Sequence, residues 1–193
     1  MSNQVNTPDT APMTEQQVNE LVQVRLDKLA ALCEAGQNPY EITKYDVTHH
    51  TADIKEHYDE LEGKIVRIAG RMMSKRIMGK ASFCNIQDRD GRIQVYVARD
   101  EIGEEAYKGF KKMDIGDILG VKGFVFKTKT GEISVRTSSI TLLSKSLLPL
   151  PEKYHGLTDK EARFRQRYVD LMVNPEVKRN FVIRSKFIKF MRN

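Results

Sequence analysis

Apolar and polar residues alternate in three successive runs between residues 64 and 100, which predicts a meander of three strands. In the middle run, the alternation puts Cys84 and Ile86 on one face and Phe83 on the other. If the aliphatic face is the core, Phe83 lies on the solvent side; the alternative is a second core layer beneath a helix or loop. The third run repeats the pattern and directs three residues outward, namely Arg92, Gln94 and Tyr96.

A helical pattern and two further alternating runs follow. Residues 101–117 carry apolar positions at helical spacing, which are Ile102, Ala106, Phe110 and Met113. Strands are then predicted over 117–129 and 132–144, joined by a hairpin at residues 129–131. Three strands, a helix and two strands is the order of the five-stranded Greek-key oligonucleotide-binding (OB) barrel. The fold class expected is therefore mainly β with flanking helices, and the rival is an antiparallel sheet with a helix on one face.

The segment before the barrel predicts an amphipathic helix. Thr14 and Gln17 fit a capping box, apolar residues recur at three- and four-residue steps up to Cys33, and Gly36 ends the pattern. An acidic connector with a short helical signal around residues 51–58 follows. We expect four segments: a disordered tail (1–13), helix and connector (14–63), the barrel (64–148), and a linker with the start of a further domain (149–193).

Two helices are predicted after the linker. Thr158 and Glu161 form a second capping box before an arginine-rich helix. Asn174 is the expected cap of the last helix, with Pro175 at its first position. This helix has no stop signal before Asn193, so the sequence is expected to be a fragment of a longer protein.

Composition excludes several classes. With 40% hydrophobic residues among 193, the chain can bury one core. No run approaches the roughly 18 apolar residues of a membrane span and no signal peptide is recognisable, which predicts a cytoplasmic protein without membrane contact. Cys33 and Cys84 are expected to be reduced, buried thiols. The four histidines form no ligand set, so no metal site is expected.

Charge is distributed unevenly along the chain. Residues 1–63 hold 4 basic and 12 acidic side chains, a net charge of −8, whereas residues 64–193 hold 28 and 14, a net charge of +14. A basic domain indicates a polyanionic partner, although a solvated basic surface is the common alternative. Four cations near the expected barrel face or on the first helix are candidate nucleic-acid backbone contacts: Arg25, Lys28, Arg71 and Lys75.

The outward face of the strands suits a single-stranded nucleic acid. Phe83 offers a ring on which a base can stack, Gln94 an amide for a base edge, and Arg76 a cation. Catalytic motifs are absent: Gly79-Lys80 lacks the phosphate-loop spacing, and no nucleophile elbow or zinc-binding helix occurs. No catalytic residue is therefore predicted.

Several segments carry a resemblance to a known family: GRMMSKRIMGKASF, FKTKTGE, LPLPEKYHGL, EARFRQRYVDLM and FVIRSKF. From Asn19 onward the chain resembles the bacterial class II lysyl-tRNA synthetases. The resemblance implies an anticodon-binding barrel followed by a homodimeric catalytic domain that uses ATP, Mg²⁺ and lysine. The sequence ends within class II motif 1, and motifs 2 and 3 are absent, so this chain is expected to hold no cofactor and not to activate lysine.

The resemblance also implies roles for individual residues. Phe83 corresponds to a ring that stacks on an anticodon base of lysine tRNA, Arg76 and Gln94 to groups that bond its edge, and Glu132 to a reader of the neighbouring base. Residue chemistry alone does not decide the role of Glu132. A hairpin carboxylate is commonly just solvated, and it could also accept a hydrogen bond from the amino group of cytosine or adenine. Four residues correspond to the motif 1 dimer helix: Phe181, Arg184, Phe187 and Ile188.

Three alternatives remain at this point. A free-standing barrel would bind single strands without sequence preference. An aspartyl- or asparaginyl-tRNA synthetase would share the fold but lacks KRIMGKASF. A fragment of this kind could also act only through dimerisation of its last helix.

Overall fold

The computed structural model describes residues 15–151 and 159–193. These residues form two compact units, which divide between Pro149 and Leu150. The expected tail at residues 1–13, and the expected capping residues Thr14 and Thr158, lie outside the described residues. No helix of the described part is both long and apolar enough to cross a membrane.

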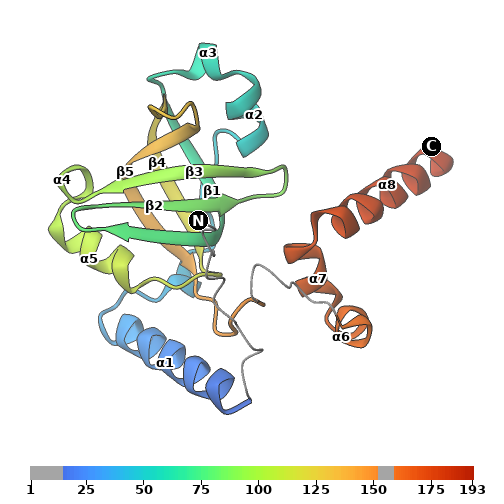
Figure 1. The fold of residues 1–193 in the computed structure, drawn as a ribbon, viewed down its shortest axis with the longest axis horizontal. Coiled ribbons are helices and arrows are strands. Elements are labelled where there is room, and N and C mark those ends of the chain that lie inside the picture. Colours follow the sequence, from blue (N-terminus) through green and yellow to red (C-terminus); the bar gives the residue numbers. More distant parts are fainter. Residues whose placement is uncertain (1–14, 152–158) are drawn as a thin grey trace, which may run out of the picture. The chain divides into compact units, whose positions relative to one another are not determined.

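Five strands close into a barrel in the order β1-β2-β3-β5-β4 (Figure 1). All neighbouring pairs are antiparallel except β3 and β5, which run parallel. Because β1 also pairs with β4, the sheet has no free edge, which confirms the predicted OB barrel and excludes the open sheet. The strands are β1 (Ile65–Met78), β2 (Ala81–Gln87), β3 (Arg92–Ala98), β4 (Ile118–Lys127) and β5 (Ile133–Ser144).

The predicted alternation of the strands is confirmed by the barrel core. Cys84 and Ile86 of β2 are at most 1% exposed and belong to the main core cluster, as do all three aliphatic residues of β3. Phe83, by contrast, is half-buried on the outer side. Burial raises the pKa of the Cys84 thiol to about 12, so this residue stays protonated. The expectation for Cys33 was wrong, because its position on the first helix is exposed.

The single helix predicted between β3 and β4 is two helices, α4 (Arg99–Ile102) and α5 (Glu104–Lys112). Gly103 separates them with a φ of 86°, a left-handed conformation that a helix interior does not contain. Helix α5 packs on the barrel through Tyr107 and Phe110. Ala106, which we predicted on the same buried face, is exposed. The Tyr107 hydroxyl is 2.8 Å from the buried Ser82 hydroxyl and ties α5 to β2.

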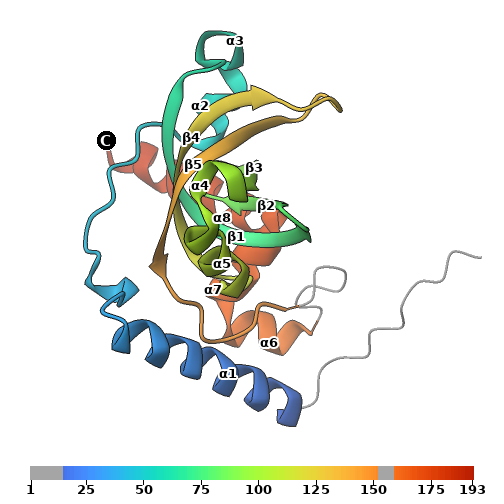
Figure 2. The same cartoon turned by 90° about the vertical axis from the view of Figure 1, so that its left-hand side faces the viewer.

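The predicted N-terminal helix is α1 (Glu15–Glu34), followed by a single 3-10 turn, η1 (Pro39–Glu41). The connector contains α2 (Thr51–Glu56) and α3 (Tyr58–Leu61). Figures 1 and 2 place α1 at one end of the barrel and α2 with α3 at the other. Asp88, which follows β2, accepts hydrogen bonds from the Thr51 N–H (2.8 Å) and hydroxyl (2.7 Å), and so fixes the start of α2.

The second unit contains α6 (Lys160–Arg165), α7 (Arg167–Val173) and α8 (Pro175–Arg192). The predicted arginine-rich helix is thus interrupted at Gln166, and Asp159 caps its start. Asn174 occupies the N-cap position of α8 but makes no cap bond; its amide instead donates to Asp170 (2.6 Å), which corrects the predicted capping role. Asp170 is fully buried and also pairs with Arg163 and Arg167.

Candidate nucleic-acid interface

A row of residues crosses the outer face of the barrel in strand register. Arg76 of β1 is opposite Phe83 of β2, Phe83 is opposite Tyr96 of β3, and Tyr96 is opposite Arg136 of β5. Residues directly opposite each other on neighbouring strands point to the same side of the sheet. The barrel therefore brings an aromatic pair and two arginines, separated by up to 60 residues in sequence, onto one surface.

Three outward rings form a connected group, which we call the outer aromatic group: Phe83, Tyr96 and Phe126. The Phe83 and Tyr96 ring centroids lie 5.1 Å apart with the planes tilted by 51°. Tyr96 in turn contacts Phe126 of β4 edge-on, at 6.2 Å and 69°. All three side chains are half-buried, so each ring is held by neighbours yet has surface exposed to solvent. Such a group can receive an unpaired base by stacking.

A second row of polar residues lies next to the rings. Gln94 of β3 is opposite Asn85 of β2 on one side and Ser134 of β5 on the other. The Ser134 hydroxyl donates to the Gln94 side-chain oxygen at 2.9 Å, which orients the amide. Arg76 is exposed, and within residues 15–151 and 159–193 its guanidinium has no hydrogen-bond or ion-pair partner. These two groups can therefore both donate to a ligand on Phe83.

Glu132 lies at the end of the hairpin that joins β4 and β5, which extends from the barrel in Figure 2. Gly131 turns the chain with a φ of 88°, and the hairpin is closed by a hydrogen bond from the Thr128 N–H to the Glu132 carbonyl (2.9 Å). The Glu132 carboxylate is about half exposed, and its nearest cation is Lys55 of α2 at 3.9 Å. Its position is thus defined by the backbone, while the carboxylate itself remains accessible.

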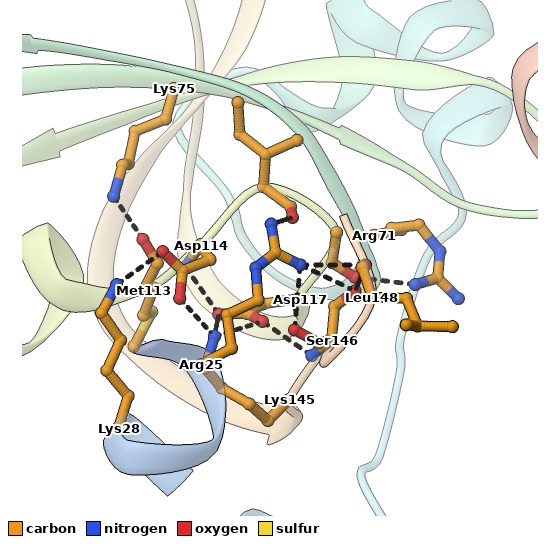
Figure 3. Close-up of polar contacts among 12 residues, drawn as sticks. Arg25, Lys28, Arg71, Lys75, Met113, Asp114, Asp117, Lys145, Ser146 and Leu148 are labelled. Carbon is orange, nitrogen blue, oxygen red and sulfur yellow. Dashed lines mark hydrogen bonds and ion pairs between the residues drawn. The ribbon is translucent and has the colours of Figure 1, made fainter. Parts of the chain in front are cut away.

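The four cations expected to contact a nucleic-acid backbone instead form contacts within the protein, at the end of the barrel where α1 packs (Figure 3). Arg25 is 9% exposed and donates to the carbonyls of Ile115 and Leu148. Lys28 pairs with Asp114 at 2.6 Å. Arg71 donates to the Gly116 carbonyl at 2.7 Å, and Lys75 to those of Lys111 and Met113. Because these donors are engaged, we leave the four residues out of the interface.

Lys145 lies at the centre of this cluster, which we call the α1 clamp: Arg25, Lys28, Asp114, Asp117 and Lys145. The Lys145 side chain is 1% exposed and pairs with Asp114 (2.6 Å) and with Asp117 (2.9 Å), which is itself fully buried (Figure 3). Asp117 also accepts the Ser146 N–H at 2.8 Å. The α1 clamp thus joins the first helix to the chain segments before β4 and after β5.

Two partly buried carboxyl groups, those of Asp88 and Asp114, lead us to expect a decline of stability in acid. Burial by itself raises the pKa of Asp114, but hydrogen bonds from Lys145 and Lys28 outweigh it and hold that pKa below its usual range. Burial likewise raises the pKa of Asp88, and bonds from Thr51 and two turn amides lower it further than burial raises it. The stability that these groups add is complete above the unfolded pKa of about 3.9 and is lost as pH falls through the lower folded values.

Urea unfolding between pH 7 and pH 3 measures this effect. The free energy of unfolding should change little down to about pH 5 and fall below about pH 4. Asp88→Asn, in which one of the two groups no longer titrates, should show a shallower decline. Stability that increases on acidification would contradict the assignment.

The residues expected on the dimer helix are all exposed in the second unit. Phe181, Phe187 and Ile188 of α8 are 38%, 60% and 45% exposed, and Arg184 is exposed as well. Phe181 is covered in part by the guanidinium of Arg167, 5.4 Å from its ring centroid. The helix therefore presents an apolar surface that the described residues of this unit do not bury.

Sequence reasoning missed two members of the interface and the α1 clamp. Tyr96 was placed outward by the alternation but given no role, and Phe126 was not singled out, although it alternates with the core residue Val125.

The described residues contain no group of three His, Cys, Asp or Glu side chains that could hold a metal ion.

A closed five-stranded barrel with this strand order is an OB fold, and its outer face carries rings, an amide and an arginine on strands β1 to β3. In agreement, residues 66–143 match the tRNA anti-codon family of OB-fold nucleic acid binding domains. The chain as a whole is homologous to the N-terminal part of the bacterial lysyl-tRNA synthetases.

Three relatives show how far this homology extends. The lysine–tRNA ligase of Thermoanaerobacter sp. (strain X514) is 54% identical over 187 residues, which cover 97% of this chain and 38% of that protein. The lysine–tRNA ligase of Carboxydothermus hydrogenoformans is 55% identical over 180 residues, which cover 93% of this chain and 37% of that protein. The lysine–tRNA ligase of Clostridium botulinum (strain Hall) is 51% identical over 178 residues, which cover 92% of this chain and 35% of that protein. The chain therefore spans well under half the length of these relatives.

Proposed function

We propose that this chain is the anticodon-binding portion of a lysyl-tRNA synthetase and that its barrel binds the anticodon stem-loop of lysine tRNA. One observation carries the proposal: an outward ring, Phe83, lies in register with Arg76, whose guanidinium has no partner among the described residues, and next to the strand of Gln94. Homology with lysine–tRNA ligases supports the choice of tRNA. In this arrangement an anticodon base stacks on Phe83, and its edge is bonded by Arg76 and Gln94.

The hydrogen-bonding of Gln94 favours uracil as that base. With its side-chain oxygen engaged by Ser134, Gln94 presents amide hydrogens, so Gln94 and Arg76 are both donors. Uracil offers two carbonyl acceptors, whereas cytosine and adenine each have an amino group that would face a donor; guanine also offers two acceptors, so the choice of uracil over guanine rests on the homology with lysine–tRNA ligases. Glu132, as an acceptor, then bonds the N3–H of a neighbouring uracil. A uridine-rich anticodon, as lysine tRNA has, fits this set.

The rest of the proposal concerns a longer parent protein. We propose that the parent attaches lysine to its tRNA in the cytoplasm, with ATP, Mg²⁺ and lysine bound by the part that follows this sequence. Residues 64–148 are its anticodon-binding domain, 14–63 the helix and connector before it, and 149–193 the linker and start of the catalytic domain. We do not expect this chain alone to aminoacylate, because the class II motifs 2 and 3 are absent from its sequence.

We propose in addition that α8 contributes to a homodimer of the parent. The exposed apolar residues Phe181, Phe187 and Ile188 support this, since a helix with such a surface is stabilised by burial against a partner.

The proposed function is tested by competition among stem-loops that differ only in the three anticodon bases. Replacing the base that lies on Phe83, from uracil to cytosine, should weaken binding about tenfold, because matched base-edge hydrogen bonds contribute roughly 1–3 kcal/mol of discrimination. A labelled lysine-anticodon stem-loop displaced by each competitor at one fixed salt concentration measures the effect.

The competition also separates the alternatives. Equal affinity for all anticodons would show a barrel that binds single strands without preference. Tighter binding of an aspartate or asparagine anticodon would reassign the domain to those synthetases. A stem-loop with a scrambled loop and an unchanged stem is the matched control for contacts to the backbone.

A further inference from the structure

Phe126 is an outward ring of the barrel to which the proposed contacts give no role. It is half-buried on β4, and its only ring contact among the described residues is with Tyr96, at 6.2 Å and 69°. An edge-on contact covers at most one of the two faces of a ring. Phe126 therefore keeps a face that no described aromatic side chain covers, next to the Phe83 and Tyr96 pair.

The register of the strands relates Phe126 to both proposed base readers. Phe126 is opposite Ser134 on β5, and Ser134 is opposite Gln94 on β3, so the three residues form one row across the outer face. Glu132 immediately precedes β5, and the backbone hydrogen bond that it accepts from the Thr128 N–H places it across the hairpin from Thr128, two residues after Phe126. Phe126 thus lies at the β4 end of this row, with Ser134 between it and Gln94, and on the hairpin that carries Glu132.

We infer that Phe126 is a second stacking platform, which receives the anticodon base adjacent to the one on Phe83 and holds its edge toward Glu132. This inference rests on the proposed function, since it specifies how the same face holds a second nucleotide. Tyr96, in contact with both rings, separates the two platforms and keeps the two bases side by side rather than stacked on each other. A carboxylate alone is a weak reader, because an exposed acceptor is satisfied equally well by water. A base held flat against Phe126 would be fixed in position, so that its N–H is directed at the Glu132 carboxylate in place of water.

Charge near the hairpin is consistent with a nucleotide at this position. Lys127 and Lys129, one and three residues after Phe126, are exposed, and Lys55 lies 3.9 Å from the Glu132 carboxylate. Lys127 is held over the Tyr58 ring at 5.7 Å. A phosphate that follows a base on Phe126 would therefore lie near these three lysines.

The test compares Phe126→Leu with Phe83→Leu in the 193-residue chain. Leucine keeps an apolar side chain of similar bulk and removes only the flat aromatic face, so loss of binding reports stacking rather than packing. The ligands are the lysine-anticodon stem-loop and three versions that each lack one anticodon base. Thermal unfolding of both variants is measured alongside to verify that the barrel is intact.

We expect Phe126→Leu to weaken binding of the intact stem-loop about five- to hundredfold. We also expect it to have no effect when the base adjacent to the one on Phe83 is absent, whereas Phe83→Leu still weakens that ligand. Equal losses by Phe126→Leu with all four ligands would overturn the inference, because packing alone would explain them. If Phe83→Leu weakens binding and Phe126→Leu does not, the inference fails and the proposed function remains. If neither variant weakens binding, both fail.

Discussion

Replacing Lys145 with methionine should lower the free energy of unfolding by roughly 3–5 kcal/mol, the usual cost of removing one partner of a buried ion pair. The Lys145 side chain is 1% exposed and is the cation nearest to Asp117, which is fully buried. Methionine occupies the space of the aliphatic part of the lysine side chain, but it leaves the Asp117 carboxylate without its charged partner in a site that excludes water. The penalty is therefore electrostatic rather than a cavity.

Lys44→Met is the matched control for this experiment. Lys44 also pairs with an aspartate, Asp46, at 3.1 Å, but both side chains are more than two thirds exposed. Solvent screens such a pair, so the change should stay within about 0.5 kcal/mol. Urea unfolding of the two variants gives the comparison directly. Equal stabilities of Lys145→Met and Lys44→Met would show that the α1 clamp contributes no net stability.

Truncating Phe83 to alanine should weaken binding of the lysine-anticodon stem-loop by roughly 1–3 kcal/mol, the usual contribution of one base stacked on an aromatic ring. The ring lies outside the barrel core, so its removal should leave the fold in place. Phe83 also contacts Tyr96 at 5.1 Å, and the truncation frees that ring to move, which adds to the loss. Titration of a fluorescent stem-loop at low and at physiological salt measures the change.

Phe190→Ala serves as the control for loss of a phenylalanine. Phe190 is 80% exposed on α8 in the second unit, far in sequence from the barrel strands. Its truncation should leave the affinity for the stem-loop unchanged. If Phe83→Ala binds as tightly as Phe190→Ala, the stacking role of Phe83 is excluded.

The barrel was predictable because its strands follow one simple rule over a long stretch. Residues such as Cys84 and Val95 alternate with polar neighbours, and a period of two specifies both the strand and its buried face. The outward position of Phe83 follows from the same rule. Gly103 was harder to interpret, since a glycine within a helical pattern is compatible with a continuous helix or with a break.

Contacts between distant segments were not predictable. The helical pattern around Arg25 and Lys28 shows only that they are polar, so it predicts side chains that are solvated or bind phosphate. Their acceptors are 86 to 123 residues away and become neighbours only when the barrel closes. Phe126 was missed for a related reason: its neighbours Tyr96 and Ser134 belong to strands whose pairing order is set by the barrel topology rather than by local pattern.

The α1 clamp also has a consequence during protein synthesis. Arg25 bonds to the Ser146 carbonyl, which is made 121 residues later. At about 5–20 residues per second, the first helix leaves the ribosome roughly 6–24 s before its docking site exists. During that interval its apolar residues, such as Val22 and Leu29, have no barrel to cover them. Nascent chains that pause before Ser146 should therefore be the ones on which chaperones bind this helix.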